Sequence, residues 1–218
     1  MQVEIWSDIA CPWCYIGKRR FEAALETFPH RDEVEIVWRS FQLDPSLPDH
    51  YEGSELDYLV SRKGLPSAQV AKMFQHVTDQ AAAVGLRYDF ESLVVANSFT
   101  AHRLLHLAKK TSHGDVVKER LLSAHFEKGR DIGDIDTLVE IAVGVGLDEA
   151  TVRDVLNSDQ YGDDVRQDIT DGQALGLHGV PFFVIDRAFG VSGAQTPEVF
   201  TDALNQAWTA AQPRFVET

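Results

Sequence analysis

Two cysteines separated by a proline and a tryptophan constrain this chain more than any other feature. The segment DIACPWCYIG, residues 8 to 17, contains Cys11 and Cys14, which are both of the cysteines among the 218 residues. A strand-like apolar pattern precedes Cys11, and Pro12 falls at the first position of an expected helix, where proline is favoured. The pair therefore lies at a junction where a strand ends and a helix begins.

The segments on either side of the pair predict a strand, a helix and a second strand. Val3 and Ile5 alternate with polar residues, and apolar positions at mixed steps of three and four then follow until Pro29 closes the helix. Alternation resumes over residues 34 to 41, VEIVWRSF. A strand, a helix and a strand in this space imply a right-handed parallel unit.

Roughly a hundred residues of almost purely helical signal come next, after a loop at residues 43 to 54 that is rich in proline and glycine. Helical spacing or a helix start signal occurs in seven segments, residues 55 to 63, 66 to 84, 91 to 110, 114 to 128, 134 to 143, 148 to 157 and 159 to 175. This stretch therefore predicts an all-helical block.

Strand signal returns towards the C-terminal end. Gly176 is placed to end the last helix of the block, and residues 178 to 193 predict a strand, a tight turn at Asp186 and Arg187, and a second strand. A final helix is expected from its cap at residue 196 to about residue 210.

This order of elements predicts an α/β fold in which a large all-helical insertion separates the two halves of a small mixed sheet. We expect the sheet unit to consist of residues 1–45 and 158–218, and the helical insertion of residues 46–157. The cysteine pair then lies at the edge where the sheet unit meets the insertion.

The charge balance limits the partners. Lysine and arginine total 20 against 34 aspartate and glutamate, so the net charge is −14 and a nucleic-acid backbone would be repelled. No stretch of about 18 apolar residues predicts a membrane span, and residues 1 to 7 lack the pattern of a secretory leader. We therefore expect a cytoplasmic protein, and that compartment disfavours a purely structural disulfide.

The junction suggests different roles for the two sulfurs. Unpaired backbone N–H groups and the positive end of the helix dipole favour a thiolate at Cys11, which is therefore the expected nucleophile. Cys14 lies one turn further along the same face, so we expect it to have the higher pKa and to resolve a mixed disulfide.

Metal binding is an alternative that the residues alone leave open. No second CxxC motif occurs, but the segment HRLLH places His102 and His106 at i and i+4, and with Cys11 and Cys14 they would make a four-ligand zinc site. Two ordinary buried cysteines are a further alternative. The strand-to-helix context favours redox chemistry over both.

Three stretches carry a resemblance to a known family, and it extends over essentially the whole chain. They are EIWSDIACPWCYIGKRRFE (4 to 22), DIGDIDTLVEIA (131 to 142) and GVPFFVIDRAFGVSGAQ (179 to 195). The chain resembles the thioredoxin fold with a DsbA-type helical insertion, and most closely the FrnE-type branch of the DsbA-like oxidoreductases. The resemblance implies a mixed four-stranded sheet and thiol:disulfide oxidoreductase or isomerase activity on protein or small-molecule disulfides, without a metal or an organic cofactor.

The resemblance also implies a role for Val180 and Pro181. In thioredoxin-like proteins this proline is cis and faces the CxxC motif, which leaves the backbone of residue 180 free to pair with an extended substrate. The alternative is a proline that only starts an edge strand.

Other candidates lie near the motif or on the insertion. Pro12 and Trp13, between the cysteines, are expected to contact substrate, although Trp13 could instead pack under the insertion. Asn97 and His102 are expected on a helix of the insertion, where they either line the cleft above Cys11 or satisfy a helix end. Asp8 either accepts a proton from Cys14 or favours the helix dipole.

The chain also departs from patterns that such relatives show. FrnE-type relatives can carry a second cysteine pair, which is absent here, and kappa-class glutathione transferases and hydroxychromene carboxylate isomerases place serine where Cys11 stands. The alternative functions are thus a glutathione-dependent transferase or isomerase of the kappa-class type, and a non-enzymatic module whose thiolates hold zinc or an iron–sulfur cluster across a dimer. The sequence does not decide whether glutathione is a partner, and it does not decide whether the protein is a monomer or a homodimer.

Overall fold

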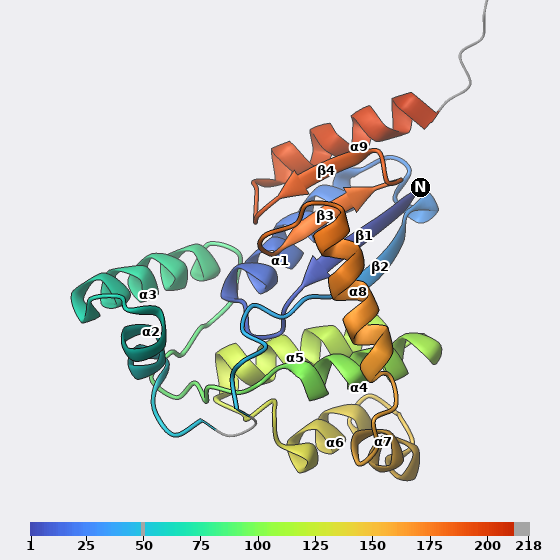
Figure 1. The fold of residues 1–218 in the computed structure, drawn as a ribbon. Helices are drawn as coiled ribbons and strands as arrows, with labels where there is room; N and C mark the ends of the chain where they lie inside the picture. The colour runs from blue at the N-terminus through green and yellow to red at the C-terminus, as the bar shows by residue number, and fades with distance from the viewer. Residues whose placement is uncertain (49–50, 212–218) are drawn as a thin grey trace, which may run out of the picture.

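A mixed sheet organises the fold. The computed structural model describes residues 1–48 and 51–211, so residues 49 and 50 of the predicted loop and residues 212–218 of the predicted sheet unit lie outside it. The strands of the sheet are β1 (Gln2–Ser7), β2 (Glu35–Ser40), β3 (Phe182–Ile185) and β4 (Phe189–Ser192). Their order is β2-β1-β3-β4, with β1 parallel to β2 and the other pairs antiparallel (Figure 1).

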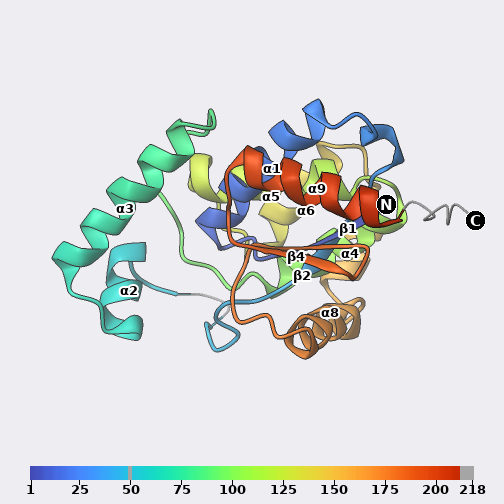
Figure 2. The same ribbon diagram turned by 90° about the horizontal axis from the view of Figure 1, so that it is seen from above.

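Helices cover both faces of this sheet and extend beyond it. They are α1 (Pro12–Thr27), α2 (Glu55–Lys63), α3 (Ser67–Ala82), α4 (Phe99–Lys110), α5 (Gly114–Lys128), α6 (Ile135–Val143), α7 (Glu149–Leu156), α8 (Gly162–Ala174) and α9 (Pro197–Ala211), with a short 3-10 turn at Arg31–Glu33. Figure 2 shows α1 and α9 on one side of the sheet and α8 on the other. The α2–α3 pair projects away from the sheet, and α4 to α7 form a layer beneath it in Figure 1.

The two faces of β1 serve different layers because side chains alternate along a strand. Val3 and Ile5 join the large core that contains residues of α1 and α9. Trp6 belongs to the opposite face, and its Nε1 donates to the carbonyl oxygen of Asp168 on α8 at 2.7 Å. This hydrogen bond attaches α8, the last helix before β3, to the sheet.

The hydrophobic core does not stop at the predicted boundary between sheet unit and insertion. One cluster of buried residues runs from Ile5 and Phe21 into Leu104 of α4 and Leu138 of α6. A second cluster joins the start of α1 to α2, α3 and the end of α5. The cysteine pair lies at the N-terminus of α1, directly before Tyr15 and Ile16 of the second cluster.

The prediction of a mixed four-stranded sheet with a large helical insertion is confirmed, and so are its main end signals. Gly176 has a φ of 82° after α8. Asp186 and Arg187 have φ values of 47° and 54° in the turn between β3 and β4, as a tight hairpin with two left-handed residues requires. Helix α9 begins at Pro197, directly after Thr196. The division into two domains stays a prediction.

Two predicted helices are too long at their N-terminal ends. The helix predicted over residues 91 to 110 begins only at Phe99, because the Asp89 carboxylate accepts the N–H groups of Glu91 and Ser92 and holds that segment in a turn. The helix predicted over residues 159 to 175 begins at Gly162, after Tyr161 with a φ of 65°. Side-chain competition and a left-handed residue thus override the apolar spacing.

Candidate active site

The cysteine pair occupies the first turn of α1. Cys11 is the N-cap residue with an extended backbone, and Pro12 is the first helical residue, as the sequence predicts. Both thiols are free, and the residues are 4% and 2% exposed respectively. The Cys14 N–H donates to the Cys11 carbonyl at 3.0 Å, which closes the turn that brings the two residues together.

The loop before β3 reaches over Cys11. The Val180–Pro181 peptide bond is cis, and the Cys11 Sγ donates to the Val180 carbonyl oxygen at 3.5 Å. Gly17 makes this approach feasible, since a Cβ at that position would lie 2.8 Å from Cγ of Pro181. Sequence reasoning missed Gly17, whose only signal was a glycine inside a predicted helix.

The pKa values of the two thiols depend on each other, and the expectation that Cys11 carries the lower one stays a prediction. The hydrogen bond to Cys14 and burial raise the pKa of the Cys11 thiol well above its ordinary value, and its sulfur faces a carbonyl oxygen. Burial also raises the pKa of Cys14, but the hydrogen bond from Cys11 and the charge of Lys118 outweigh it and lower that pKa. The two thiols thus shift each other's pKa, and the assignment of the nucleophile rests on access to the sulfur.

Asp8 is a buried anchor at this end of β1. It is 1% exposed, and its carboxylate accepts the backbone N–H groups of Ala10 at 3.2 Å and Leu43 at 2.8 Å. The Nε2 atom of His102 lies 3.3 Å from the Oδ1 atom of Asp8. Burial raises the pKa of Asp8, but these hydrogen bonds hold it below its usual value. The carboxylate therefore fixes the turn that presents Cys11.

A buried lysine beneath the pair was missed by sequence reasoning. Lys118 of α5 is 0% exposed, its Nζ has no hydrogen-bond partner among residues 1–48 and 51–211, and that atom lies 5.4 Å from the centroid of a Trp38 ring. Burial lowers the pKa of Lys118 to about 8, against the charges of Cys14 and Asp8, which raise it. The helical spacing of Lys118 with buried Leu122 and His125 is the signal that could have placed it inward.

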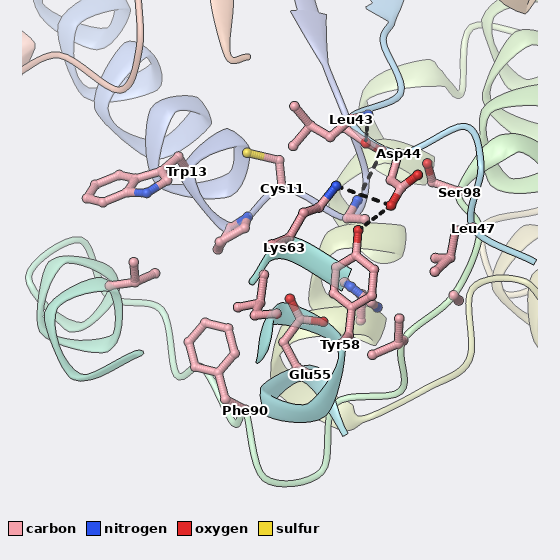
Figure 3. A pocket seen from close by; sticks show the side chains of 18 of the residues that line it. Cys11, Trp13, Leu43, Asp44, Leu47, Glu55, Tyr58, Lys63, Phe90 and Ser98 are labelled. Carbon is pink, nitrogen blue, oxygen red and sulfur yellow. Dashed lines mark hydrogen bonds and ion pairs between the residues drawn. The ribbon is translucent and has the colours of Figure 1, made fainter. Parts of the chain in front are cut away.

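An apolar pocket of about 270 Å³ opens beside Cys11. Figure 3 shows Cys11 and Trp13 at one side of the pocket, with Glu55, Tyr58 and Phe90 across from them. The Trp13 ring also packs against His76 of α3, with ring centroids 5.8 Å apart, so it both lines the pocket and contacts the insertion. Burial alone raises the pKa of Glu55 to about 7.

The polar wall of this pocket is a connected cluster. The Asp44 carboxylate accepts hydrogen bonds from the Tyr58 hydroxyl at 2.6 Å and from the Lys63 ammonium at 3.2 Å (Figure 3). Burial raises the pKa of Asp44, but hydrogen bonds from Ser46, Tyr58 and Lys63 bring it below its usual range. The pocket is thus apolar beside the sulfur and charged at the far wall.

Two predicted substrate contacts do not line the pocket. Asn97 precedes α4, where its side chain accepts from the Phe99 N–H and donates to the Leu47 carbonyl, so it holds two loops together. His102 is fully buried against Asp8. Pro12 and Trp13 do line the pocket, whereas Val180 and Pro181 lie at Cys11 and Gly17 outside it.

The histidine pair of the zinc alternative is not assembled with the cysteines. His106 Nε2 lies 3.1 Å from Oδ2 of Asp168, whereas His102 bonds to Asp8. Across residues 1–48 and 51–211, no group of three or more histidine, cysteine, aspartate or glutamate side chains is arranged to hold a metal ion. In the same residues no helix has the length and apolar character to cross a membrane.

The sheet order, the helical insertion and a CXXC pair facing a cis-proline loop define a thioredoxin-fold protein of the DsbA type. Comparison with known families agrees, because the model of the DSBA-like thioredoxin domain matches residues 2–205. The chain belongs to this family, which is a family of thiol:disulfide oxidoreductases.

Individual relatives show how far the likeness extends. A probable DsbA oxidoreductase from Streptomyces coelicolor has a crystal structure with a TM-score of 0.93 and 48% identity, covering 98% of this chain and 92% of that one. The uncharacterised protein YwbO of Bacillus subtilis strain 168 is 30% identical over 94% of this chain and 96% of its own. The cytosolic disulfide reductase DsbM from Pseudomonas aeruginosa with GSH shares the fold, with a TM-score of 0.67, 17% identity, and coverage of 96% of this chain and 100% of its own.

Proposed function

We propose that the protein catalyses dithiol–disulfide exchange, with Cys11 as the attacking cysteine and Cys14 as the resolving one. The observation that carries this proposal is the position of the Cys11 sulfur, which lies between the Val180 carbonyl and an apolar pocket. Cys14 is the more buried of the two and does not line that pocket. An incoming disulfide therefore meets Cys11 first.

In the reducing direction the Cys11 thiol loses its proton to water, and the Cys11 thiolate attacks one sulfur of the substrate disulfide. The substrate S–S bond breaks, a Cys11–substrate mixed disulfide forms, and the first substrate thiolate takes a proton from water. Cys14 then loses its proton to water and attacks Cys11 Sγ, which releases the second substrate thiolate to take a proton from water and leaves a Cys11–Cys14 disulfide. The two cysteines supply both electrons, and the oxidising direction is the reverse.

Substrate binding is proposed at two places around Cys11. The backbone of Val180 supports an extended segment on one side of the sulfur, as strand addition does in peptide recognition. On the other side, Pro12 and Trp13 border a pocket whose 270 Å³ admits one apolar side chain or part of a small disulfide. Protein disulfides and small disulfides or thiols, glutathione among them, are therefore the proposed substrate class.

We also propose a cytoplasmic location, which agrees with the acidic composition and with the cytosolic disulfide reductase that shares the fold. Membership of the FrnE-type branch, the domain boundaries and a monomeric or dimeric state stay predictions.

Two assays on the wild-type protein separate the proposal from the kappa-class alternative. We expect the protein to accelerate reduction of insulin disulfides by a dithiol, or to reshuffle scrambled ribonuclease. Glutathione conjugation to an electrophile, with no disulfide exchange in either assay, would contradict the proposal. Metal analysis of anaerobically purified protein tests the metal-binding alternative, for which stoichiometric zinc or iron is required.

A further inference from the structure

One carboxylate in the pocket beside Cys11 has no partner. Glu55, the first residue of α2, lines this pocket across from Cys11, and Figure 3 shows its carboxylate directed into the pocket. Among residues 1–48 and 51–211, its side chain makes no hydrogen bond and no ion pair, and burial is the only cause that raises its pKa to about 7. A neighbouring cation would oppose that rise, so no group compensates the burial of this acid.

The other charged groups of the pocket are already paired. The Asp8 carboxylate accepts from two backbone N–H groups. Asp44 accepts from the Tyr58 hydroxyl at 2.6 Å and from the Lys63 ammonium at 3.2 Å. Among the described residues that line the pocket, Lys63 is the only lysine or arginine, and Asp44 engages it. Glu55 is therefore the acceptor that the pocket leaves for a ligand.

The helix dipole does not account for the placement of Glu55. An acidic residue in the first turn of a helix is favourable wherever its side chain points, and α2 has a second such residue in Asp57. Asp57 is exposed, and its carboxylate accepts from the Ser54 N–H at 3.1 Å to complete a capping box. Glu55 instead lies against an apolar cavity, where an ionised carboxylate is costly without a cation.

Aromatic rings surround this carboxylate. Trp13, Tyr58, Phe74 and Phe90 line the same pocket, and the rings of Phe74 and Phe90 stack with centroids 4.4 Å apart. Figure 3 shows Phe90 and Tyr58 beside Glu55. Because ring faces attract cations, a carboxylate among aromatic rings suits an ammonium group carried on apolar carbons. An anionic group would meet Glu55 and the net charge of −14.

We propose that Glu55 makes this pocket selective for small disulfides that carry an ammonium group on an apolar arm, and that the ammonium pairs with the Glu55 carboxylate while the disulfide meets Cys11. This inference rests on the proposed function and names its substrate class. Glu55 takes no part in the covalent change. Cys11 and Cys14 supply two electrons, their S–S bond forms as the substrate S–S bond breaks, and the two thiol protons pass through water to the two substrate thiolates.

Three disulfides of similar size test the proposal on the wild-type protein. Cystamine carries two ammonium groups, bis(2-hydroxyethyl) disulfide is neutral, and dithiodipropionate carries two carboxylates. The measurement is the second-order rate constant for oxidation of the reduced protein in a single turnover at pH 8, where most molecules carry the Glu55 carboxylate. Each value is divided by the rate constant for dithiothreitol, which removes the intrinsic reactivity of the disulfide. Cystamine should then exceed the neutral disulfide about tenfold, and dithiodipropionate should be the slowest.

A conservative substitution assigns the preference to one side chain. Glu55→Gln should lower the rate constant for cystamine about tenfold and leave that for the neutral disulfide unchanged, because only the charge is removed. Glu52→Gln is the matched control, since it makes the same change at an exposed position outside the pocket, three residues earlier. We expect the control to leave all three rate constants unchanged. Glu55→Asp keeps the charge and should keep part of the preference.

Equal losses for all three disulfides in Glu55→Gln would overturn the inference, and so would an equal effect of Glu52→Gln. The wild-type comparison needs no variant, so it decides the matter if Glu55→Gln does not fold, and a preference no greater than that of dithiothreitol would overturn the inference.

Failure of the proposed function is distinguishable from failure of this inference. If the wild-type protein reacts with none of the three disulfides, disulfide exchange is refuted, and calorimetric binding of 1,6-diaminohexane then tests the cation site alone. This diamine matches cystamine in length and lacks sulfur. It should bind wild-type protein about tenfold more tightly than Glu55→Gln, whereas 1,6-hexanediol should not distinguish them. Equal or absent binding of the diamine would overturn the inference.

Discussion

Two buried polar clusters in this molecule are built in opposite ways. Around Asp168 of α8, which is 2% exposed, the Arg39 guanidinium donates at 2.9 Å, the Ser40 N–H donates at 2.9 Å, and His106 Nε2 lies 3.1 Å away. Around Lys118, also buried, no hydrogen bond is made by the charged nitrogen within the described residues. We call the groups around Asp168 the satisfied cluster, because the carboxylate has several partners, and the groups around Lys118 the open cluster, because its ammonium lacks one among the described residues.

The unsatisfied atoms are not scattered through the protein. Within residues 1–48 and 51–211, the buried side-chain nitrogen and oxygen atoms that lack a partner are Ser7 Oγ, Ser98 Oγ, His102 Nδ1, Lys118 Nζ and His125 Nδ1. Ser98 and His125 line the pocket beside Cys11. Ser7 directly precedes Asp8 in the chain, and His102 contacts the Asp8 carboxylate. Lys118 acts on the thiols by its charge. The unsatisfied polar atoms thus gather near the reacting sulfurs, although satisfied carboxylates such as Asp8 lie there too.

The largest expected effect is a loss of disulfide-exchange activity without a loss of stability. Cys11→Ala removes the attacking sulfur, so disulfide exchange should fall by about a thousandfold or more in kcat/KM, measured by insulin reduction. The free energy of unfolding should change little, because alanine keeps the Cβ atom and the hydrogen bond from the Cys11 sulfur to the Val180 carbonyl is long, at 3.5 Å. Full activity of this variant would refute the assignment of Cys11.

The satisfied cluster should behave in the reverse manner. Asp168→Ala leaves Arg39, His106 and Lys109 without their shared carboxylate, and we expect a loss of about 3 to 5 kcal/mol in the free energy of unfolding, measured in urea. The rate of disulfide exchange should be unchanged. Asp164→Ala, at an exposed position of the same helix, is the control and should cost well under half as much. A small loss for Asp168→Ala would break the contrast between the clusters.

Acid should act on the same carboxylate. Burial raises the pKa of Asp168, but hydrogen bonding to His106 and the charge of Lys109 lower it to about 2. Because this folded-state pKa is below the unfolded value of 3.8, the stabilisation is complete above about pH 5 and is lost as pH falls through 2. Wild-type protein should lose about 2 kcal/mol more over that interval than Asp168→Asn does. Parallel pH curves for the two proteins would contradict this account.

The smallest expected effect concerns the open cluster. Lys118→Met replaces a buried ammonium that has no hydrogen-bond partner in the part of the chain that the structure describes, so it should increase the free energy of unfolding by about 1 kcal/mol. The gain should be larger in the disulfide form than in the dithiol form, since only the dithiol form offers a thiolate. Urea unfolding of both forms measures it, and a loss of stability in both would show that Lys118 is a structural cation.

The parts of the fold that depend on local pattern were predictable from the sequence. Pro12 after Cys11 places the start of α1, and the hairpin at Asp186 and Arg187 follows from its position between two apolar runs. The start of α4 was wrong by eight residues, because the Asp89 side chain competes with the helix for backbone N–H groups. Apolar spacing contains no information about that competition.

The candidate site was predictable only where the chain brings residues together locally. Cys11, Cys14, Pro12 and Trp13 are adjacent in sequence, and the resemblance added the loop at Pro181. Lys118 reaches the pair through packing of α5 against α1, so no local motif announces it. The same packing adds a charge that the helix dipole does not include, since Lys118 lowers the pKa of Cys14.

Trapping with the Cys14→Ser variant tests the central claim most directly. If Cys11 attacks and Cys14 resolves, this variant should accumulate a mixed disulfide on Cys11 when it is mixed with a substrate disulfide, and mass spectrometry of non-reduced peptides should locate the adduct there. Cys11→Ser, mixed with the same substrate, should retain far less adduct because Cys14 is buried and outside the pocket. An adduct that forms mainly on Cys14, or no adduct in either variant, would contradict the account.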